Sequence, residues 1–187
     1  MRLKPEIVTL GILSILFVLM GAAFLNVTLG SWCWWILVAA AIGFFLYELK
    51  VNEIGITSEL AKKALLVGLF LMLFDFGVEN TGWILGYWHT QNGIIAVGTV
   101  PLAVMLVCFI GGAGWALYLP KKFDLGFSLY DSLVFAFWGA LGEWVLSTQG
   151  LMVYTKGWTS ALAFGAYFIT WAVLHWVRYK SPLKISE

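Results

Sequence analysis

The chain has 187 residues, of which 61% are hydrophobic and only 11% are charged. A soluble domain of this size has too little interior to hide so much apolar surface, and the composition therefore indicates a membrane protein. The formal net charge is +1, without a basic stripe, so we expect no nucleic-acid partner.

Six apolar runs follow one another along the chain, each long enough to cross a bilayer as a helix. They span roughly residues 7–25, 32–49, 64–86, 93–118, 126–148 and 159–178. The runs lack the two-residue alternation that is typical of a membrane barrel. The sequence therefore predicts an all-α integral membrane protein in which residues 1–187 form a single domain of six transmembrane helices.

The basic residues predict how these helices are oriented. Ten of the eleven lysines and arginines fall at alternate ends of the runs, and only Lys156 falls on the other side. The ten are Arg2, Lys4, Lys50, Lys62, Lys63, Lys121, Lys122, Arg178, Lys180 and Lys184. The positive-inside rule then predicts a multi-pass protein of the cell membrane with both termini in the cytoplasm.

Several single residues have expected structural roles within these runs. Ser58 is expected to cap the third helix, Pro101 to kink the fourth, and Pro120 to end it. Cys33 and Cys108 lie in apolar surroundings without a Cys-x-x-Cys spacing, so both are interpreted as packing residues.

Three carboxylates lie inside the apolar runs, namely Asp75, Glu79 and Glu143. A charge at bilayer depth costs at least ~2.5–3.5 kcal/mol, so such residues are usually paired, solvated or functional. Asp75 and Glu79 are four residues apart and share one helix face. In a dry site they are unlikely both to be ionised, and a carboxylic acid that keeps its proton is suited to acid catalysis. The three are therefore the candidate catalytic residues.

Polar and aromatic side chains gather at the outer side of the same helices. We interpret as candidate substrate-binding residues Asn80, Trp83, Trp88, His89, Trp144, Gln149, Tyr154 and Trp158. Anchoring at the membrane interface is the alternative role for the tryptophans and tyrosines. Gly82 and Gly86 have the spacing of a close helix contact.

Other titratable residues lie near the cytoplasmic helix ends. Glu48 and Asp131 are expected to reach water there and to be structural, and His175 is expected to be interfacial. Metal ligation is disfavoured because the chain has only two histidines and no His-x-x-x-His, Glu-x-x-His or cysteine pair. Phosphate-binding and dinucleotide-binding motifs are absent as well, so we expect no cofactor.

A weak internal repeat is visible around two of the acids. Glu79 and Glu143 are each followed seven residues later by a glycine, Gly86 or Gly150, and then by aromatic residues. This spacing predicts parallel helical-hairpin repeats over 64–118 and 126–178. Chance is the alternative explanation, because glycine and tryptophan are abundant throughout the chain.

The segment from Glu79 to Leu102 reads ENTGWILGYWHTQNGIIAVGTVPL. It resembles membrane proteins of carotenoid biosynthesis, namely the heterodimer-type lycopene cyclases and the related carotenoid hydratases. The similarity lies in the acid-bearing helix, the turn at Gly86-Tyr87-Trp88-His89, the Gly93-Ile94 start and the Gly98-Thr99-Val100-Pro101-Leu102 segment. The cyclases have acidic residues directly after Pro-Leu, where this chain has Ala103 and Val104, and the hydratase-like branch matches better there.

The resemblance implies a lyase or isomerase that protonates a double bond of an isoprenoid without a redox cofactor. Glu79 or Asp75 would donate the proton, and Glu143 would act as counter-base or cation stabiliser. Further candidates for cation stabilisation are Trp83, Trp88 and Trp144.

Two non-enzymatic functions remain open at this stage. Short loops and glycine-rich helices also suit an accessory subunit of a membrane complex, or a homo-oligomer. Acids near the bilayer centre also suit a small transporter or proton pathway.

Overall fold

The computed structural model describes residues 29–51, 57–91 and 94–182. This part of the chain contains the helices α2 (Trp32–Val51), α3 (Ser58–Leu85), α4 (Leu102–Tyr118), α5 (Leu125–Thr148) and α6 (Ser160–Lys180). Of these, α2, α5 and α6 are long and apolar enough to cross a membrane, and α4 is a shorter apolar helix. The mostly helical fold is thus confirmed for these residues, whereas the predicted run 7–25 lies outside them.

Side-chain caps fix where three of the helices begin. Thr57 accepts a hydrogen bond from the backbone N–H of Leu60, so α3 is capped one residue before the predicted Ser58. Asp124 accepts from Phe127 N at 2.7 Å and starts α5, and Thr159 does the same for α6. Each cap satisfies one of the N–H groups that a first helical turn leaves without an intrahelical partner.

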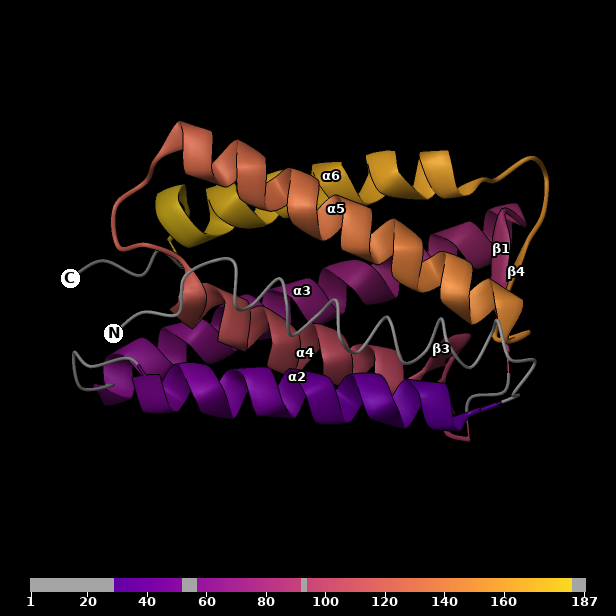
Figure 1. Ribbon diagram of the computed structural model, residues 1–187, viewed down its shortest axis with the longest axis horizontal. Coiled ribbons are helices and arrows are strands. Elements are labelled where there is room, and N and C mark those ends of the chain that lie inside the picture. Colours follow the sequence, from indigo (N-terminus) through magenta and orange to yellow (C-terminus); the bar gives the residue numbers. More distant parts are fainter. Residues whose placement is uncertain (1–28, 52–56, 92–93, 183–187) are drawn as a thin grey trace.

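Four short strands lie in the segments that follow α3 and α5. β1 (Trp88–Thr90) pairs antiparallel with β4 (Met152–Tyr154), and β2 (Ala96–Val97) pairs antiparallel with β3 (Val100–Pro101). In the first pair Trp88 lies opposite Tyr154. The β1–β4 pair joins the ends of α3 and α5 at one end of the molecule (Figure 1).

The β2–β3 hairpin corrects the predicted fourth helix. Gly98, with a φ of 63°, turns the chain between the two strands, and α4 begins only at Leu102. Pro101 therefore lies directly before the helix, where its missing N–H costs no intrahelical hydrogen bond. The predicted kink at Pro101 is wrong, while the predicted end of α4 before Pro120 is confirmed.

The helices pack as two groups. α4 contacts both α2 and α3, and α5 packs along α6 (Figure 1). Small residues allow the first group to approach closely: a Cβ on Gly112 would lie 3.2 Å from the Cα of Gly68, and one on Gly114 would lie 2.9 Å from the ring of Phe44. The glycines of α4 thus form a face for close packing against α2 and α3.

Two apolar cores occupy opposite ends of the molecule. The core near the β1–β4 pair includes Cys33, Trp88 and Leu151, and the core at the other end includes Trp115 and Leu174. Cys33 is fully buried within the first core, as its packing role requires. The candidate acids lie on the helices between these two cores.

Candidate functional site

Glu79 is held by an indole that the chain brings back over its own helix. Trp88 Nε1 donates a hydrogen bond of 3.0 Å to Glu79 Oε2. Gly86 ends α3 in the left-handed region (φ 72°), and the indole of Trp88 then lies over Gly82, where a Cβ would overlap its ring. The predicted helix contact through Gly82 and Gly86 is therefore wrong, because one glycine makes room for the indole and the other makes the turn.

Glu143 is held by one phenol and interacts with a second. Tyr154 Oη donates to Glu143 Oε2 at 2.5 Å from strand β4, and the phenol of Tyr167 on α6 interacts electrostatically with the same carboxyl group. The ring of Tyr167 lies against Gly139, one helical turn before Glu143. Burial and the adjacent Glu143 both raise the pKa of Tyr154, so this phenol remains a neutral donor.

The surroundings of Glu79 and Glu143 resemble each other. Gly150, like Gly86, has a positive φ of 68° and lies seven residues after its acid. A short strand follows in both cases, and the two donors, Trp88 and Tyr154, lie opposite each other in the β1–β4 pair. The same order of acid, glycine and strand in both segments is consistent with the predicted hairpin repeat, which remains a prediction.

Asp75 completes the cluster. Its carboxyl group interacts electrostatically with those of Glu79 and Glu143. The thiol of Cys108 on α4 interacts electrostatically with it. Asp75 Oδ2 is buried and has no hydrogen-bond partner among the described residues. The three candidate acids thus lie near enough to interact electrostatically, and the interaction of Cys108 with Asp75 is one that the packing interpretation missed.

Within the described ranges, no lysine, arginine or histidine pairs with these three carboxyl groups. Three negative charges would repel one another in such an apolar site, so the acid cluster, defined as Asp75, Glu79 and Glu143, is suited to hold protons. In the same part of the chain, no group of three or more His, Cys, Asp or Glu side chains has an arrangement that could hold a metal ion.

Trp158 is the only further tryptophan of the predicted set that reaches Trp88 in the described structure. Their ring centroids lie 4.5 Å apart, and Trp158 also contacts Tyr87 at 5.7 Å. These three rings form an aromatic cluster beside Glu79. Tyr87 joins the cluster through its place next to Trp88 in the chain.

The remaining predicted binding residues lie outside this arrangement. His89 follows Trp88 in β1 and so points to the other side of the strand, where its ring lies 4.3 Å from that of Trp83. Asn80 donates to Phe76 O and accepts from Thr99, and Gln149 accepts from Leu29 N. Trp144 is 38% exposed. Asn80 and Gln149 thus tie loops to helices.

A second buried polar cluster was misjudged from the sequence. Asp131 and His175 are each only 3% exposed, and His175 Nε2 lies 2.9 Å from Asp131 Oδ2. Trp115 Nε1 donates to the same oxygen at 2.9 Å. Glu48 is also buried, at 5% exposure. The predictions that Glu48 and Asp131 reach water, and that His175 is interfacial, are therefore wrong, because neighbouring helices cover these positions.

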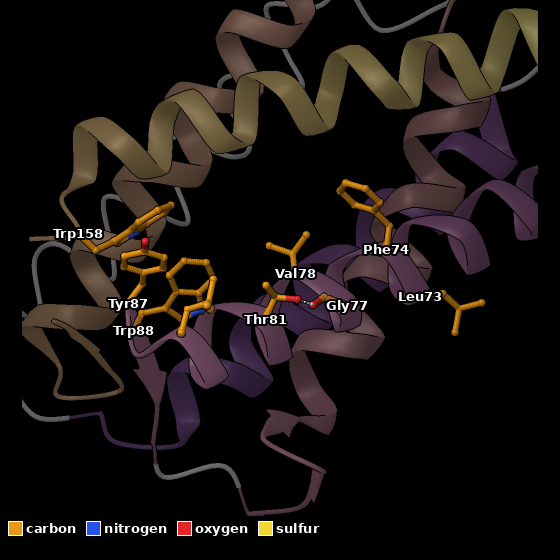
Figure 2. A pocket seen from close by; sticks show the side chains of 10 residues that line it. Leu73, Phe74, Gly77, Val78, Thr81, Tyr87, Trp88 and Trp158 are labelled. Carbon is orange, nitrogen blue, oxygen red and sulfur yellow. Dashed lines mark hydrogen bonds between the residues drawn. The ribbon is translucent and has the colours of Figure 1, made fainter. Parts of the chain in front are cut away.

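An apolar groove of about 540 Å³ runs along α3 to the aromatic cluster (Figure 2). It is lined by Leu73, Phe74, Gly77, Val78, Thr81, Gly82, Leu85, Tyr87, Trp88 and Trp158. The acids do not line it, but Trp88 does, and the same indole holds Glu79. Trp88 therefore connects the groove to the acid cluster.

The site can hold, donate and take back protons beside aromatic rings and an apolar groove. Its donors to the acids are an indole and a phenol, and a second phenol and a thiol interact with them electrostatically; all four are neutral groups. Comparisons with protein families, with curated proteins and with solved structures find no match for this chain.

Proposed function

We propose that this chain is a six-span integral membrane enzyme that acts on an isoprenoid or similar lipid by protonating a carbon–carbon double bond. The observation that carries the proposal is the electrostatic interaction of Asp75, Glu79 and Glu143 without a cationic partner among the described residues. Acids that keep their protons in an apolar site are the usual means of Brønsted acid catalysis in enzymes.

The proton comes from the Asp75–Glu79 pair. The O–H bond of the acid breaks as a C–H bond forms at one carbon of the double bond, which leaves a carbocation at the other carbon and a carboxylate on the enzyme. The faces of Trp88 and Trp158 stabilise such a cation by ~2 kcal/mol or more where water is excluded. Trp88 also donates to Glu79, so it stabilises the carboxylate that forms.

Glu143 ends the reaction. As a carboxylate it removes a proton from a carbon next to the cation, so that the double bond reforms in a new position or within a ring. Addition of water to the cation, with loss of a proton to Glu143, gives a hydrated product instead. In either case the proton then passes from Glu143 back to the carboxylate of the Asp75–Glu79 pair, which restores the starting protonation states. Tyr154 holds Glu143 in place for these steps.

The proposed topology extends what the described helices support. Three of them are long and apolar enough to span a membrane, and the apolar run 7–25, α3 and α4 supply the remaining spans. α3 has 28 residues and carries Asp75 and Glu79 in its second half. In this arrangement the acid cluster lies toward the outer leaflet, and both termini lie in the cytoplasm.

Expression in a bacterium that makes lycopene tests the activity. Pigment extracts of cells that carry the chain are compared by liquid chromatography and mass spectrometry with extracts of the Glu79→Gln and Asp75→Asn variants. The expected product is shifted in mass by one water, or has the mass of lycopene with a changed retention time. Either variant is expected to lower its yield by about 10²–10⁴-fold, the usual contribution of a general acid.

Glu59→Gln is the matched control, because Glu59 lies on the same helix and is exposed. It is expected to leave the product unchanged. Unaltered lycopene in every strain would contradict the proposal for carotenoid substrates and would favour an accessory subunit. In that case Glu79→Gln would weaken the assembly of a membrane complex without changing any product.

A further inference from the structure

The groove along α3 is elongated. Phe74, Val78, Thr81 and Leu85 follow one another at helical spacing and form its length. From Leu73 to Leu85 this face extends about 18 Å, at 1.5 Å of rise per residue. A volume of about 540 Å³ falls within the usual range of ligand sites, about 300–1,000 Å³. The shape fits a chain rather than a compact molecule.

The lining offers no charged group to recognise a polar head group. None of the ten lining residues is charged. The Thr81 hydroxyl already donates to Gly77 O at 2.7 Å, and the Trp88 indole N–H donates to Glu79. Leu73 and Leu85 are 57% and 48% exposed, so the groove has an apolar rim. This chemistry fits a hydrocarbon that enters sideways from the membrane.

One end of the groove differs from the other. Figure 2 shows the rings of Tyr87, Trp88 and Trp158 gathered at one end, with Phe74 and Leu73 toward the other. Aromatic faces attract the electron-poor carbons of a developing cation and pack well on flat, unsaturated groups. An unsaturated chain end is therefore favoured where the aromatic cluster meets Glu79.

We infer that the groove binds the hydrocarbon chain of an unsaturated isoprenoid drawn from the bilayer, with the chain end against Tyr87, Trp88 and Trp158. The inference rests on the proposed function, because it specifies what that enzyme binds. In this arrangement the face of α3 selects which hydrocarbon chain fits. Gly77 leaves the groove open there, because a Cβ at this position would meet no atom within 4 Å.

Binding is measured on the purified full chain in lipid nanodiscs, with all-trans-retinol as the isoprenoid polyene probe. Energy transfer from tryptophan to the polyene reports binding, and the part of it that Gly77→Leu removes reports occupancy of the groove. Gly77→Leu places a side chain in the groove from a position where a Cβ meets no atom within 4 Å, and we expect it to weaken saturable transfer by at least about tenfold. Gly43→Leu is the matched control, since Gly43 is an exposed helical glycine of α2 that also has no neighbour within 4 Å.

Two competitors test the class of ligand. Squalene, an unsaturated isoprenoid, is expected to displace retinol, and hexadecane, a saturated chain, is expected to displace it more weakly. Equal binding by Gly77→Leu and the unchanged chain, or transfer that rises with lipid partitioning and never saturates, would overturn the inference.

A Glu143→Gln variant separates this inference from the proposed function. It is expected to bind retinol normally, because Glu143 does not line the groove. Saturable retinol binding that depends on Gly77, without any lycopene product, would support the groove as a binding site and refute the catalytic proposal. A lycopene product that persists in Gly77→Leu, with unchanged retinol binding, would refute the groove and leave the catalysis intact.

Discussion

The ring of Tyr167 packs directly on Gly139, so that a Cβ at position 139 would lie 2.6 Å from the ring. Tyr167 also interacts electrostatically with Glu143, which lies on the same helix as Gly139. The place of the phenol therefore depends on the absence of a side chain one turn away. Gly82 and the indole of Trp88 have the same relationship beside Glu79.

Gly139→Ala is expected to displace Tyr167 and to lower the proposed activity by about 100-fold, the cost of misplacing a catalytic group by about 1 Å. Gly142→Ala is the matched control, because a Cβ there meets nothing within 4 Å. In a helix that change stabilises by about 0.5–1 kcal/mol. Product yield and thermal unfolding in detergent distinguish the two variants, and equal yields would contradict the role of Tyr167.

Trp88→Phe removes the donor to Glu79 and keeps an aromatic ring. We expect a loss of about 1 kcal/mol in unfolding free energy, because a partly buried carboxyl oxygen loses its partner, together with a lower product yield. Trp34→Phe is the matched control, because it removes the same atoms from a tryptophan that is also buried. Trp34 Nε1 has no hydrogen-bond partner in the described structure, so this change breaks no hydrogen bond. A loss of yield that is as large in Trp34→Phe would point to packing alone.

Trp115→Phe is expected to lower stability without lowering the activity of the folded protein. It removes the indole bond to Asp131 in the second buried cluster, at a cost of about 1–3 kcal/mol. Ser128→Ala, on the same helix as Asp131, removes a buried hydroxyl that has no partner among the described residues, and is expected to be neutral. Thermal unfolding measures both, and a specific loss of product by Trp115→Phe would implicate this cluster in the reaction.

The proposed reaction is expected to slow as the pH on the outer side rises. An acid that donates a proton is active only while protonated, so a higher pH removes the reactive form. Tyr154 does not cause this dependence, because its pKa is raised and the phenol stays neutral. Product formation in spheroplasts at different external pH is the measurement, and a rate that increases with pH would exclude a carboxylic acid as the donor.

The sequence predicts the acids of the site better than their partners. Asp75, Glu79 and Glu143 are conspicuous because they interrupt apolar runs, and helical spacing places two of them on one face. Cys108 and Tyr167 are inconspicuous because they are ordinary residues of apolar helices, and they reach the acids only through helix packing. The burial of Asp131 and His175 was misjudged for a related reason. Both lie near helix ends in the sequence, but each is buried by side chains of neighbouring helices.

The limits of the helices were predicted where the apolar pattern ends at a turn. Pro120 marks the end of α4, and Gly86 marks the end of α3. The start of α4 was misplaced, because the residues before Pro101 are apolar enough to look helical although they form a hairpin. Hydropathy does not separate a short apolar strand pair from the first turns of a helix.

The acid cluster depends on two chain segments, one with α3 and β1 and one with α5 and β4, which the pairing of β1 with β4 holds together. A fragment that ends at Lys122 carries Asp75 and Glu79 but lacks Glu143 and its tyrosines, and a fragment that begins at Phe123 carries the reverse. Neither fragment has a complete set of acids, so two separate genes could encode this site only if their products met in the same membrane.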